Sequence, residues 1–366
     1  MSTEITKIQE LLKDIIHPET GLNIVESGIL AEVKEESREL FITLEFTKST
    51  DPFLNSIKNS IKEKLENNFG STYIINIVTK TKKVVKPKIK TTAGVEEVAN
   101  IIAIASGKGG VGKSTITVNL AVALAQMGYK CGVVDADIFG PSIPKMFGIE
   151  NEKPSVVVEN GKELIVPVEK YGIKILSIGF FIDPKNAAIW RGPMASGVLK
   201  QFINDAKWGE LDFLLFDLPP GTSDIHLTLV QSVPVTGAVI VSTPQQVAIA
   251  DARKGVAMFR ADGINVPVLG IVENMSWFTP EELPENKYYI FGKGGVEALA
   301  EETQIQILGQ IPIVQSICES GDIGKPVASN PRTIQGKAFE DLAVKFVEAV
   351  EKRNKELPKT QQVVVK

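Results

Sequence analysis

Residues 101–124 read IIAIASGKGGVGKSTITVNLAVAL, which is an apolar run, a glycine-rich loop and then an apolar helical stretch. Main-chain N–H groups in such a loop and the N-terminal end of the following helix attract an anion, and phosphate is the natural ligand. The spacing from Gly107 to Gly112, followed by Lys113 and Ser114, is that of a P-loop, in which the lysine contacts terminal phosphates and the serine binds Mg²⁺. The sequence therefore predicts an ATP–Mg²⁺ site. The nucleotide-binding residues that this spacing predicts are Gly107, Gly109, Gly110, Val111, Gly112, Lys113 and Ser114.

The same letters also fit the Gly-x-Gly-x-x-Gly turn of a dinucleotide site, with Asp135 near the distance of its ribose-binding acid. A dinucleotide turn has no need of two lysines beside a diphosphate, whereas a triphosphate with a metal ion does. A plain strand-to-helix turn would leave the glycines and lysines unexplained. We therefore interpret the segment as a P-loop.

Short aliphatic runs recur after the loop, among them CGVVDAD, FLLFDLPP, GAVIVSTP and VLGIVENM. Strands that are apolar on both faces are typical of a parallel sheet covered by helices on both sides. The stretches between them, such as 115–127 and 247–260, are long enough for right-handed crossover helices. The predicted fold class is α/β, a doubly wound, mostly parallel P-loop NTPase sheet preceded by a small α+β domain.

Carboxylates follow two of these runs, where the ends of parallel strands meet. Asp217 closes a strand and is expected to hold Mg²⁺ through a water, and a turn that could sense a γ-phosphate follows it at 219–221. Asp137 is placed to orient the attacking water, although it could instead be a turn or N-cap residue. Asp135 and Asp224 are further candidates, and for Asp135 the structural and functional interpretations stay open.

The chain has 366 residues, which predicts more than one domain. Residues 1–80 are expected to form the α+β domain, 81–97 a lysine-rich linker, 98–357 the ATPase domain and 358–366 a tail. The net charge of −4 argues against general binding to nucleic acid or anionic membrane. No signal sequence or membrane-spanning run is visible, so we expect a cytoplasmic protein.

The segment SGKGGVGKST resembles the deviant Walker A loop of the group that includes MinD and the nitrogenase iron protein. Members of this group close as nucleotide-sandwich dimers. The residues alone leave Lys108 either as a solvated lysine or as a cation that reaches a nucleotide across a dimer interface. The resemblance favours the second role and implies a homodimer.

Blocks such as DADIFGPSIPKMFG, WRGPMASGVLKQF, FDLPPGTSDIHLTL and IFGKGG are similar to those of the Mrp/ApbC iron-sulfur cluster carrier ATPases. Residues 1–80 resemble the MIP18-type domain that often precedes this ATPase. The resemblance implies slow ATP hydrolysis, transfer of clusters to apoprotein clients, and base recognition by Asn274, which could equally be a strand-end turn residue. The catalytic residues that it implies are Lys108, Lys113, Asp137 and Asp217, and it adds Lys108 and Thr115 to the expected nucleotide-binding residues.

The cysteines depart from this family, whose carriers hold the cluster with a Cys-x-x-Cys after the Asn-Met-Ser block. The corresponding stretch here, MSWFTPEELPENKYYIFG, has none, and the chain contains only Cys131 and Cys318. Iron-sulfur clusters are held mainly by thiolates. A symmetric dimer could bring two copies of Cys318 together as iron-sulfur ligands, or Cys318 could be a plain buried or surface cysteine. Cys131 is expected in the core.

The sequence supports two candidate functions and disfavours a third. The first is an iron-sulfur cluster carrier or assembly ATPase. The alternative is an ATP-driven dimeric switch of the same family that binds a client without binding a cluster. A membrane-positioning or DNA-partitioning ATPase is disfavoured, because the sequence shows no amphipathic C-terminal anchor and no net basic face.

Overall fold

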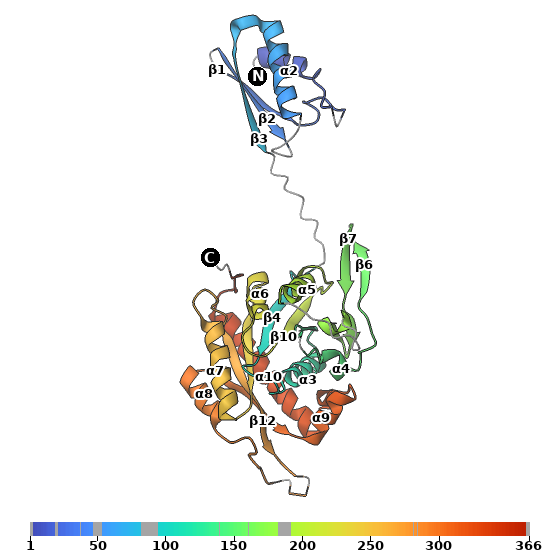
Figure 1. Cartoon of the computed structure of the whole chain (residues 1–366), viewed down its shortest axis with the longest axis vertical. Helices are drawn as coiled ribbons and strands as arrows, with labels where there is room; N and C mark the ends of the chain where they lie inside the picture. Colours follow the sequence, from blue (N-terminus) through green and yellow to red (C-terminus); the bar gives the residue numbers. More distant parts are fainter. Residues whose placement is uncertain are drawn as a thin grey trace. The chain divides into compact units, whose positions relative to one another are not determined.

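The computed structural model describes residues 3–18, 21–36, 38–46, 53–81, 94–138, 140–159, 161–181, 192–280, 282–283 and 285–363. The chain divides into two compact units, residues 1–90 and 91–366 (Figure 1). Most of the expected linker, residues 82–93, lies outside the described part of the chain.

The small unit is a three-stranded sheet packed against helices. Its elements are α1 (Thr3–Leu12), β1 (Leu30–Glu36), β2 (Glu39–Phe46), α2 (Leu54–Phe69) and β3 (Ile74–Thr81). The central strand β2 pairs antiparallel with β1 and parallel with β3. Alternate residues of β2 are buried, and α2 buries Ile57, Ile61 and Leu65 at a spacing of one helical turn. This is the small α+β domain that the sequence predicts.

The large unit is built on an eight-stranded sheet in the order β13-β12-β11-β4-β10-β5-β9-β8. Every pairing is parallel except that of β8 with β9, where β8 adds an antiparallel edge. The strands are β4 (Val98–Ala105), β5 (Cys131–Asp135), β8 (Val168–Lys170), β9 (Ile173–Ser177), β10 (Leu211–Asp217), β11 (Gly237–Ser242), β12 (Val268–Phe278) and β13 (Ile307–Ile313). The predicted mostly parallel sheet is confirmed.

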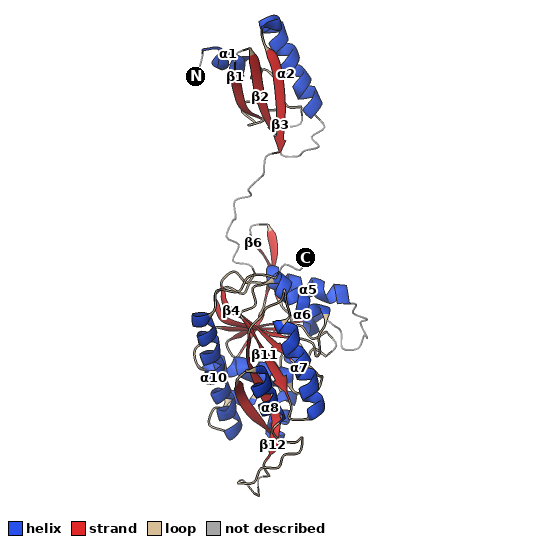
Figure 2. Cartoon of the chain, turned by 90° about the vertical axis from the view of Figure 1, so that its left-hand side faces the viewer, coloured by secondary structure: helices blue, strands red, loops and turns tan. Residues whose placement is uncertain are grey.

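Helices cover both faces of this sheet. One face carries α3 (Lys113–Gln126) and α10 (Ile334–Glu356), with the short α4 (Ile143–Phe147) and α9 (Gln315–Asp322) nearby. The other carries α5 (Gly192–Asn204), α6 (Asp224–Ser232), α7 (Gln246–Arg260) and α8 (Gly295–Thr303). Figure 2 shows the strands between α10 on one side and α5, α6 and α7 on the other.

The central strand β4 shows why its sequence is apolar throughout. Ile102 and Ile104 pack into the core beneath α3 and α10, whereas Ile101, Ala103 and Ala105 pack beneath the helices of the opposite face. Successive side chains of a strand point to opposite faces, so a strand covered on both sides is apolar at every position.

Two further segments complete the large unit. A separate antiparallel hairpin is formed by β6 (Ser155–Glu159) and β7 (Lys162–Val166). At the other end of the chain, Arg353 donates hydrogen bonds to the carbonyl of Pro358 at 2.8 Å and to Thr360 Oγ1 at 2.7 Å. The main-chain N–H of Val363 donates to Val230 of α6 at 3.1 Å, so residues 358–363 pass from α10 to α6. None of the described helices is both long and apolar enough to cross a membrane.

We expect Phe346→Ala to lower the free energy of unfolding of the large unit by about 3–5 kcal/mol. Phe346 of α10 is fully buried, and its ring centroid lies 5.4 Å from that of Phe213 on β10. Urea unfolding followed by tryptophan fluorescence reports on this unit alone. The three tryptophans, Trp190, Trp208 and Trp277, all lie in it.

Val344→Ala is the matched control, because this residue of the same helix is 40% exposed. We expect it to cost less than about 1 kcal/mol. Equal losses in the two variants would contradict the packing of α10 on the sheet.

Candidate nucleotide-binding site

The site lies at the carboxyl ends of three neighbouring central strands of the sheet, β4, β10 and β5. Asp217 at the end of β10 pairs in register with Ile104 of β4 and with Asp135 of β5. The glycine-rich loop leaves β4 at this edge and leads into α3. Because parallel strands end at the same edge, the loop and both aspartates are brought together.

The loop backbone depends on glycine at two positions in different ways. Gly112, the N-cap of α3, has φ 82°, a left-handed conformation that side chains disfavour. At Gly107 a Cβ atom would lie 2.1 Å from the carbonyl carbon of Asp251 in α7, so only glycine fits. The loop borders a cavity of about 180 Å³. This cavity is lined by Ser106, Lys108, Gly109, Gly110, Val111, Gly112, Lys113, Ser114, Thr115, Asp137, Ser142, Met146 and Pro220.

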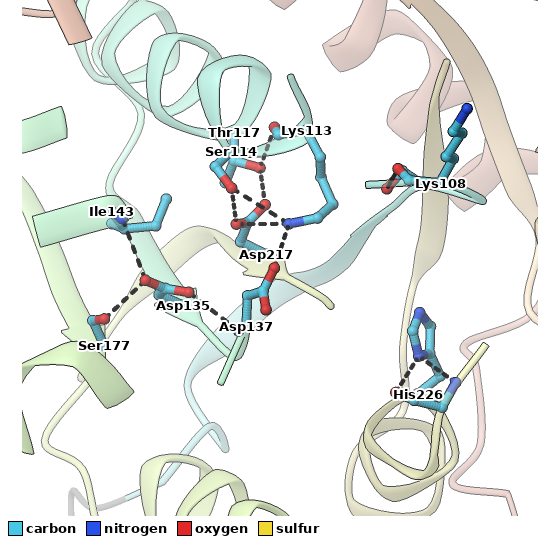
Figure 3. A network of polar contacts seen from close by, with 12 residues as sticks. Lys108, Lys113, Ser114, Thr117, Asp135, Asp137, Ile143, Ser177, Asp217 and His226 are labelled. Carbon is cyan, nitrogen blue, oxygen red and sulfur yellow. Dashed lines mark hydrogen bonds and ion pairs between the residues drawn. The ribbon is translucent and has the colours of Figure 1, made fainter. Parts of the chain in front are cut away.

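Asp217 is the centre of a buried polar network (Figure 3). Lys113 Nζ lies 2.8 Å from Asp217 Oδ2, and the lysine and aspartate side chains are 6% and 0% exposed. Ser114 Oγ donates to Asp217 Oδ2 at 2.6 Å, and Thr117 Oγ1 donates to Asp217 Oδ1 at 2.7 Å. The aspartate thus joins the end of β10 to the first turn of α3.

The oxygens of this network suit Mg²⁺. The Ser114 hydroxyl and the Asp217 carboxylate are hard ligands that touch each other beside the loop. Mg²⁺ prefers oxygen ligands and keeps several waters, so one hydroxyl and one carboxylate acting through water are sufficient protein contacts. Within the described residues, no group of three or more His, Cys, Asp or Glu side chains is arranged to hold a metal ion. A phosphate-bound Mg²⁺ does not require such a group.

Asp137 and Asp135 have different environments, although both belong to the loop after β5. Asp137 lines the cavity and its Oδ2 lies 4.0 Å from Lys113 Nζ. Asp135 is fully buried, and its carboxylate accepts hydrogen bonds from Asp137 N at 3.2 Å, Ile143 N at 3.3 Å and Ser177 Oγ at 2.8 Å. Asp135 therefore connects Asp137 and the start of α4 to β9, which fits the structural one of the two interpretations left open for it.

Lys108 and Asn274, both expected to contact nucleotide, take distinct positions. The side chain of Lys108 is exposed, and among the described residues it forms no ion pair. Asn274 of β12 is 5% exposed, and its Nδ2 donates to the carbonyl of Val111 at 2.9 Å. A Cβ atom on Gly112 would lie 2.1 Å from this Nδ2, so Asn274 packs directly on the loop and supports its backbone.

The two cysteines differ in their exposure to solvent. Cys131 is buried at the start of β5, and burial, helped by the charge of Asp212, raises the pKa of its thiol to about 12. Cys318 is exposed on α9. Cys131 is a core residue, as its sequence context predicts.

The chain between β12 and α8 extends away from the sheet (Figure 1) and forms a short hairpin, residues 277–290, of which 281 and 284 are not described. Phe278 and Tyr288 exchange main-chain hydrogen bonds of 2.9 and 2.8 Å, and Lys287 Nζ lies 3.8 Å from the centre of the Trp277 ring. The hairpin exposes apolar side chains. These are Leu283, Tyr288, Tyr289 and Ile290.

Comparison with known proteins gives two family matches. A model described as NUBPL iron-transfer P-loop NTPase matches residues 97–347, and one described as iron-sulfur cluster assembly protein matches residues 5–72. An iron-sulfur cluster carrier protein of Synechocystis sp. is 42% identical over 335 residues, covering 91% of this chain and 94% of that protein. A second, from Aquifex aeolicus, is 50% identical over 266 residues, covering 72% of this chain and 71% of that protein.

Among solved structures, a nucleotide-binding protein from Archaeoglobus fulgidus in complex with ADP is 39% identical to this chain. The two superpose with a TM-score of 0.56 over 67% of this chain and 93% of that one.

We expect the free energy of unfolding of Asp135→Asn to fall less with rising pH than that of the wild type. Burial, followed by the negative charge of Asp217, raises the pKa of the Asp135 carboxyl to about 8 from 3.8. The folded chain then binds a proton that the unfolded chain has released, so the contribution of Asp135 is full below 3.8 and is lost as pH rises through about 8. The measurement is urea unfolding between about pH 5 and about pH 9.

The wild-type unfolding free energy should fall more steeply over this range than that of Asp135→Asn, which cannot ionise. Asp341→Asn, on the surface of α10 and 61% exposed, should keep the wild-type slope. Identical slopes for all three proteins would show that Asp135 does not titrate in this range.

Proposed function

Since the chain belongs to the NUBPL iron-transfer P-loop NTPase family, we propose that it binds and hydrolyses ATP and carries iron-sulfur clusters to apoprotein clients. The family resemblance predicted from the motifs is thereby confirmed. The observation that carries the ATPase part is the contact of Lys113 and Ser114 with Asp217 at the end of β10. The carrier part rests on two relatives, 42% and 50% identical, that are named iron-sulfur cluster carrier proteins.

Each group of the network has a distinct task in this proposal. Lys113 leaves the carboxylate of Asp217 to contact the terminal phosphates. Ser114, together with Asp217 acting through a water, would hold Mg²⁺, which would neutralise charge on the phosphates. The loop N–H groups and the α3 N-terminus bind the remaining phosphate oxygens. Asp137, at the cavity wall and 4.0 Å from Lys113, orients the attacking water.

Lys108 supports a homodimer as the hydrolysing species. It belongs to the phosphate loop, yet its side chain is exposed and forms no ion pair with the described residues. A cation placed there suits a nucleotide bound to a second copy, in the way an arginine finger acts in trans. Hydrolysis would then require two chains, each completing the site of the other.

The cluster is the cargo, and Cys318 is the thiol best placed to hold it. Thiolates are the usual ligands of iron-sulfur clusters, and a thiol must be accessible and deprotonated to bind. Cys318 is exposed on α9, whereas Cys131 is buried with a pKa of about 12. A symmetric dimer offers two copies of Cys318, so other groups, including those of the client, must supply the remaining ligands.

A second candidate function is an ATP-driven switch that binds clients without holding the cluster itself. The observation that favours it is the 277–290 hairpin, which contains no cysteine and exposes Tyr288, Tyr289 and Ile290. Aromatic residues are enriched where proteins bind one another. In this version ATP binding changes the affinity for a client, and no thiol of this chain is required.

We expect Lys113→Ala to abolish ATP binding, because it removes the cation for the terminal phosphates. Lys108→Ala should bind ATP as the wild type does and lose at least about 1000-fold in hydrolysis, the range for a trans-acting cation. Binding is measured by calorimetry and hydrolysis by phosphate release at increasing protein concentration. Lys254→Ala, an exposed lysine on α7, is the charge control. Wild-type turnover by Lys108→Ala would refute the trans role.

Anaerobic reconstitution with iron and sulfide separates the two candidate functions. The carrier proposal expects a visible iron-sulfur absorbance in the wild type and in Cys131→Ala, and its loss in Cys318→Ser. Transfer to an apoprotein acceptor should then depend on ATP. A wild-type protein that hydrolyses ATP but takes up no iron and sulfide would overturn carriage and favour the switch.

A further inference from the structure

The N-terminus of α6 is capped in an unusual way. Ser223 is the N-cap, and its side chain accepts from the main-chain N–H of His226, three residues on. In return, the main-chain N–H of Ser223 donates to His226 Nδ1 at 3.2 Å. This reciprocal arrangement is a capping box, in which the third residue is ordinarily Glu or Gln. Here an imidazole supplies the acceptor.

The direction of this bond determines the state of the imidazole. Nδ1 must present its lone pair to the Ser223 N–H, so the ring is neutral and its proton is on Nε2. His226 is 1% exposed, and burial lowers its pKa to about 4. The ring therefore stays neutral at physiological pH and adds no charge beside the phosphate site.

The cap holds one end of a loop whose other end is Asp217. Residues 218–223 pass along the P-loop: the N–H of Leu218 donates to Ile104 O at 3.0 Å and the N–H of Gly221 to Ser106 O at 2.8 Å. Pro220, between them, lines the nucleotide cavity. The position of Pro220 is thus fixed from one side by the strand end and from the other by the Ser223–His226 cap.

The other ring nitrogen of His226 takes no part in the cap. This atom, Nε2, is buried and has no hydrogen-bond partner among the described residues. A buried donor without an acceptor is destabilising, and a glutamine or glutamate could form the same cap from the same helical position. Figure 3 shows the imidazole directed toward the P-loop segment that carries Lys108. What the 218–223 loop requires at this position is the acceptor that Nδ1 supplies to the main-chain N–H of Ser223.

We propose that His226 is a positioning residue for ATP hydrolysis: its Nδ1 fixes Ser223 and thereby places the 218–223 loop, with Pro220, against the phosphates. The inference rests on the proposed ATPase function. His226 acts through the loop and does not touch the nucleotide, so it affects the chemical step and leaves ground-state binding nearly unchanged. A displacement of about 1 Å at a reacting centre is enough to slow a reaction about 100-fold.

The test compares His226→Phe, which fills the ring volume without an acceptor, with His226→Gln, which restores the acceptor. We expect His226→Phe to lower the single-turnover rate about 10- to 100-fold, with the ATP dissociation constant within about threefold of the wild type. His226→Gln should recover most of the rate. Amide hydrogen exchange at Ser223 should be fast in His226→Phe and slow in His226→Gln and the wild type.

Thr333→Val is the matched control, because it removes a cap from α10, where Thr333 Oγ1 accepts from Gly336 N at 3.0 Å. It should lower the melting temperature without changing the rate. The inference is overturned if His226→Phe hydrolyses ATP at the wild-type rate, or if His226→Gln is as slow as His226→Phe. A wild-type protein that hydrolyses no ATP would instead overturn the proposed function, while exchange at Ser223 would still report on the cap.

Discussion

The buried contact between Lys113 and Asp217 is the interaction on which the rest of the site depends. Removing an ammonium and a carboxylate from water costs several kcal/mol for each ion, so neither is buried without partners. Asp217 is satisfied by Lys113, Ser114 and Thr117 together, at 2.6 to 2.8 Å. These donors come from a single turn of α3 and the acceptor from the end of β10. The pair therefore fixes the helix against the sheet and, with it, the loop that precedes the helix.

Hydrogen bonds of three residues outside this network hold the neighbouring loops in place. Asp135 holds the loop that carries Asp137, Asn274 holds the carbonyl of Val111, and His226 holds the loop that follows Asp217. Asp135 and Asn274 belong to strands of the sheet, and His226 belongs to the first turn of α6. Such preorganisation matters for phosphoryl transfer, where the protein contributes positioning and electrostatic stabilisation more than covalent chemistry.

The features that concern the cargo are separate from those that concern ATP. Lys113 and Asp217 are buried and paired with each other, whereas Cys318 and the 277–290 hairpin are exposed. Asn274 and the hairpin belong to the same stretch of chain at the end of β12, so a change in the P-loop has a short covalent path to the exposed aromatic residues. In the carrier proposal the chain holds an iron-sulfur cluster, whereas in the switch proposal it binds a client protein without holding a cluster.

The sequence by itself determined the fold class, the small α+β domain and the phosphate loop, because these depend on local spacing and periodicity. An apolar strand, the loop from Gly107 to Ser114 and a following helix predict the phosphate-binding geometry within a few residues. The aliphatic runs indicate that helices cover both faces of the sheet. Only the tertiary structure decided the contacts of Thr117, Asn274, Asp135 and His226. Thr117 is 100 residues from Asp217, and Asn274 is 163 from Val111. For His226 the partner is local, but its burial, which keeps the ring neutral and leaves Nε2 without an acceptor, comes from the packing of distant helices. Hydrogen bonds and desolvation of this kind arise from proximity in space, which residue order along the chain does not encode.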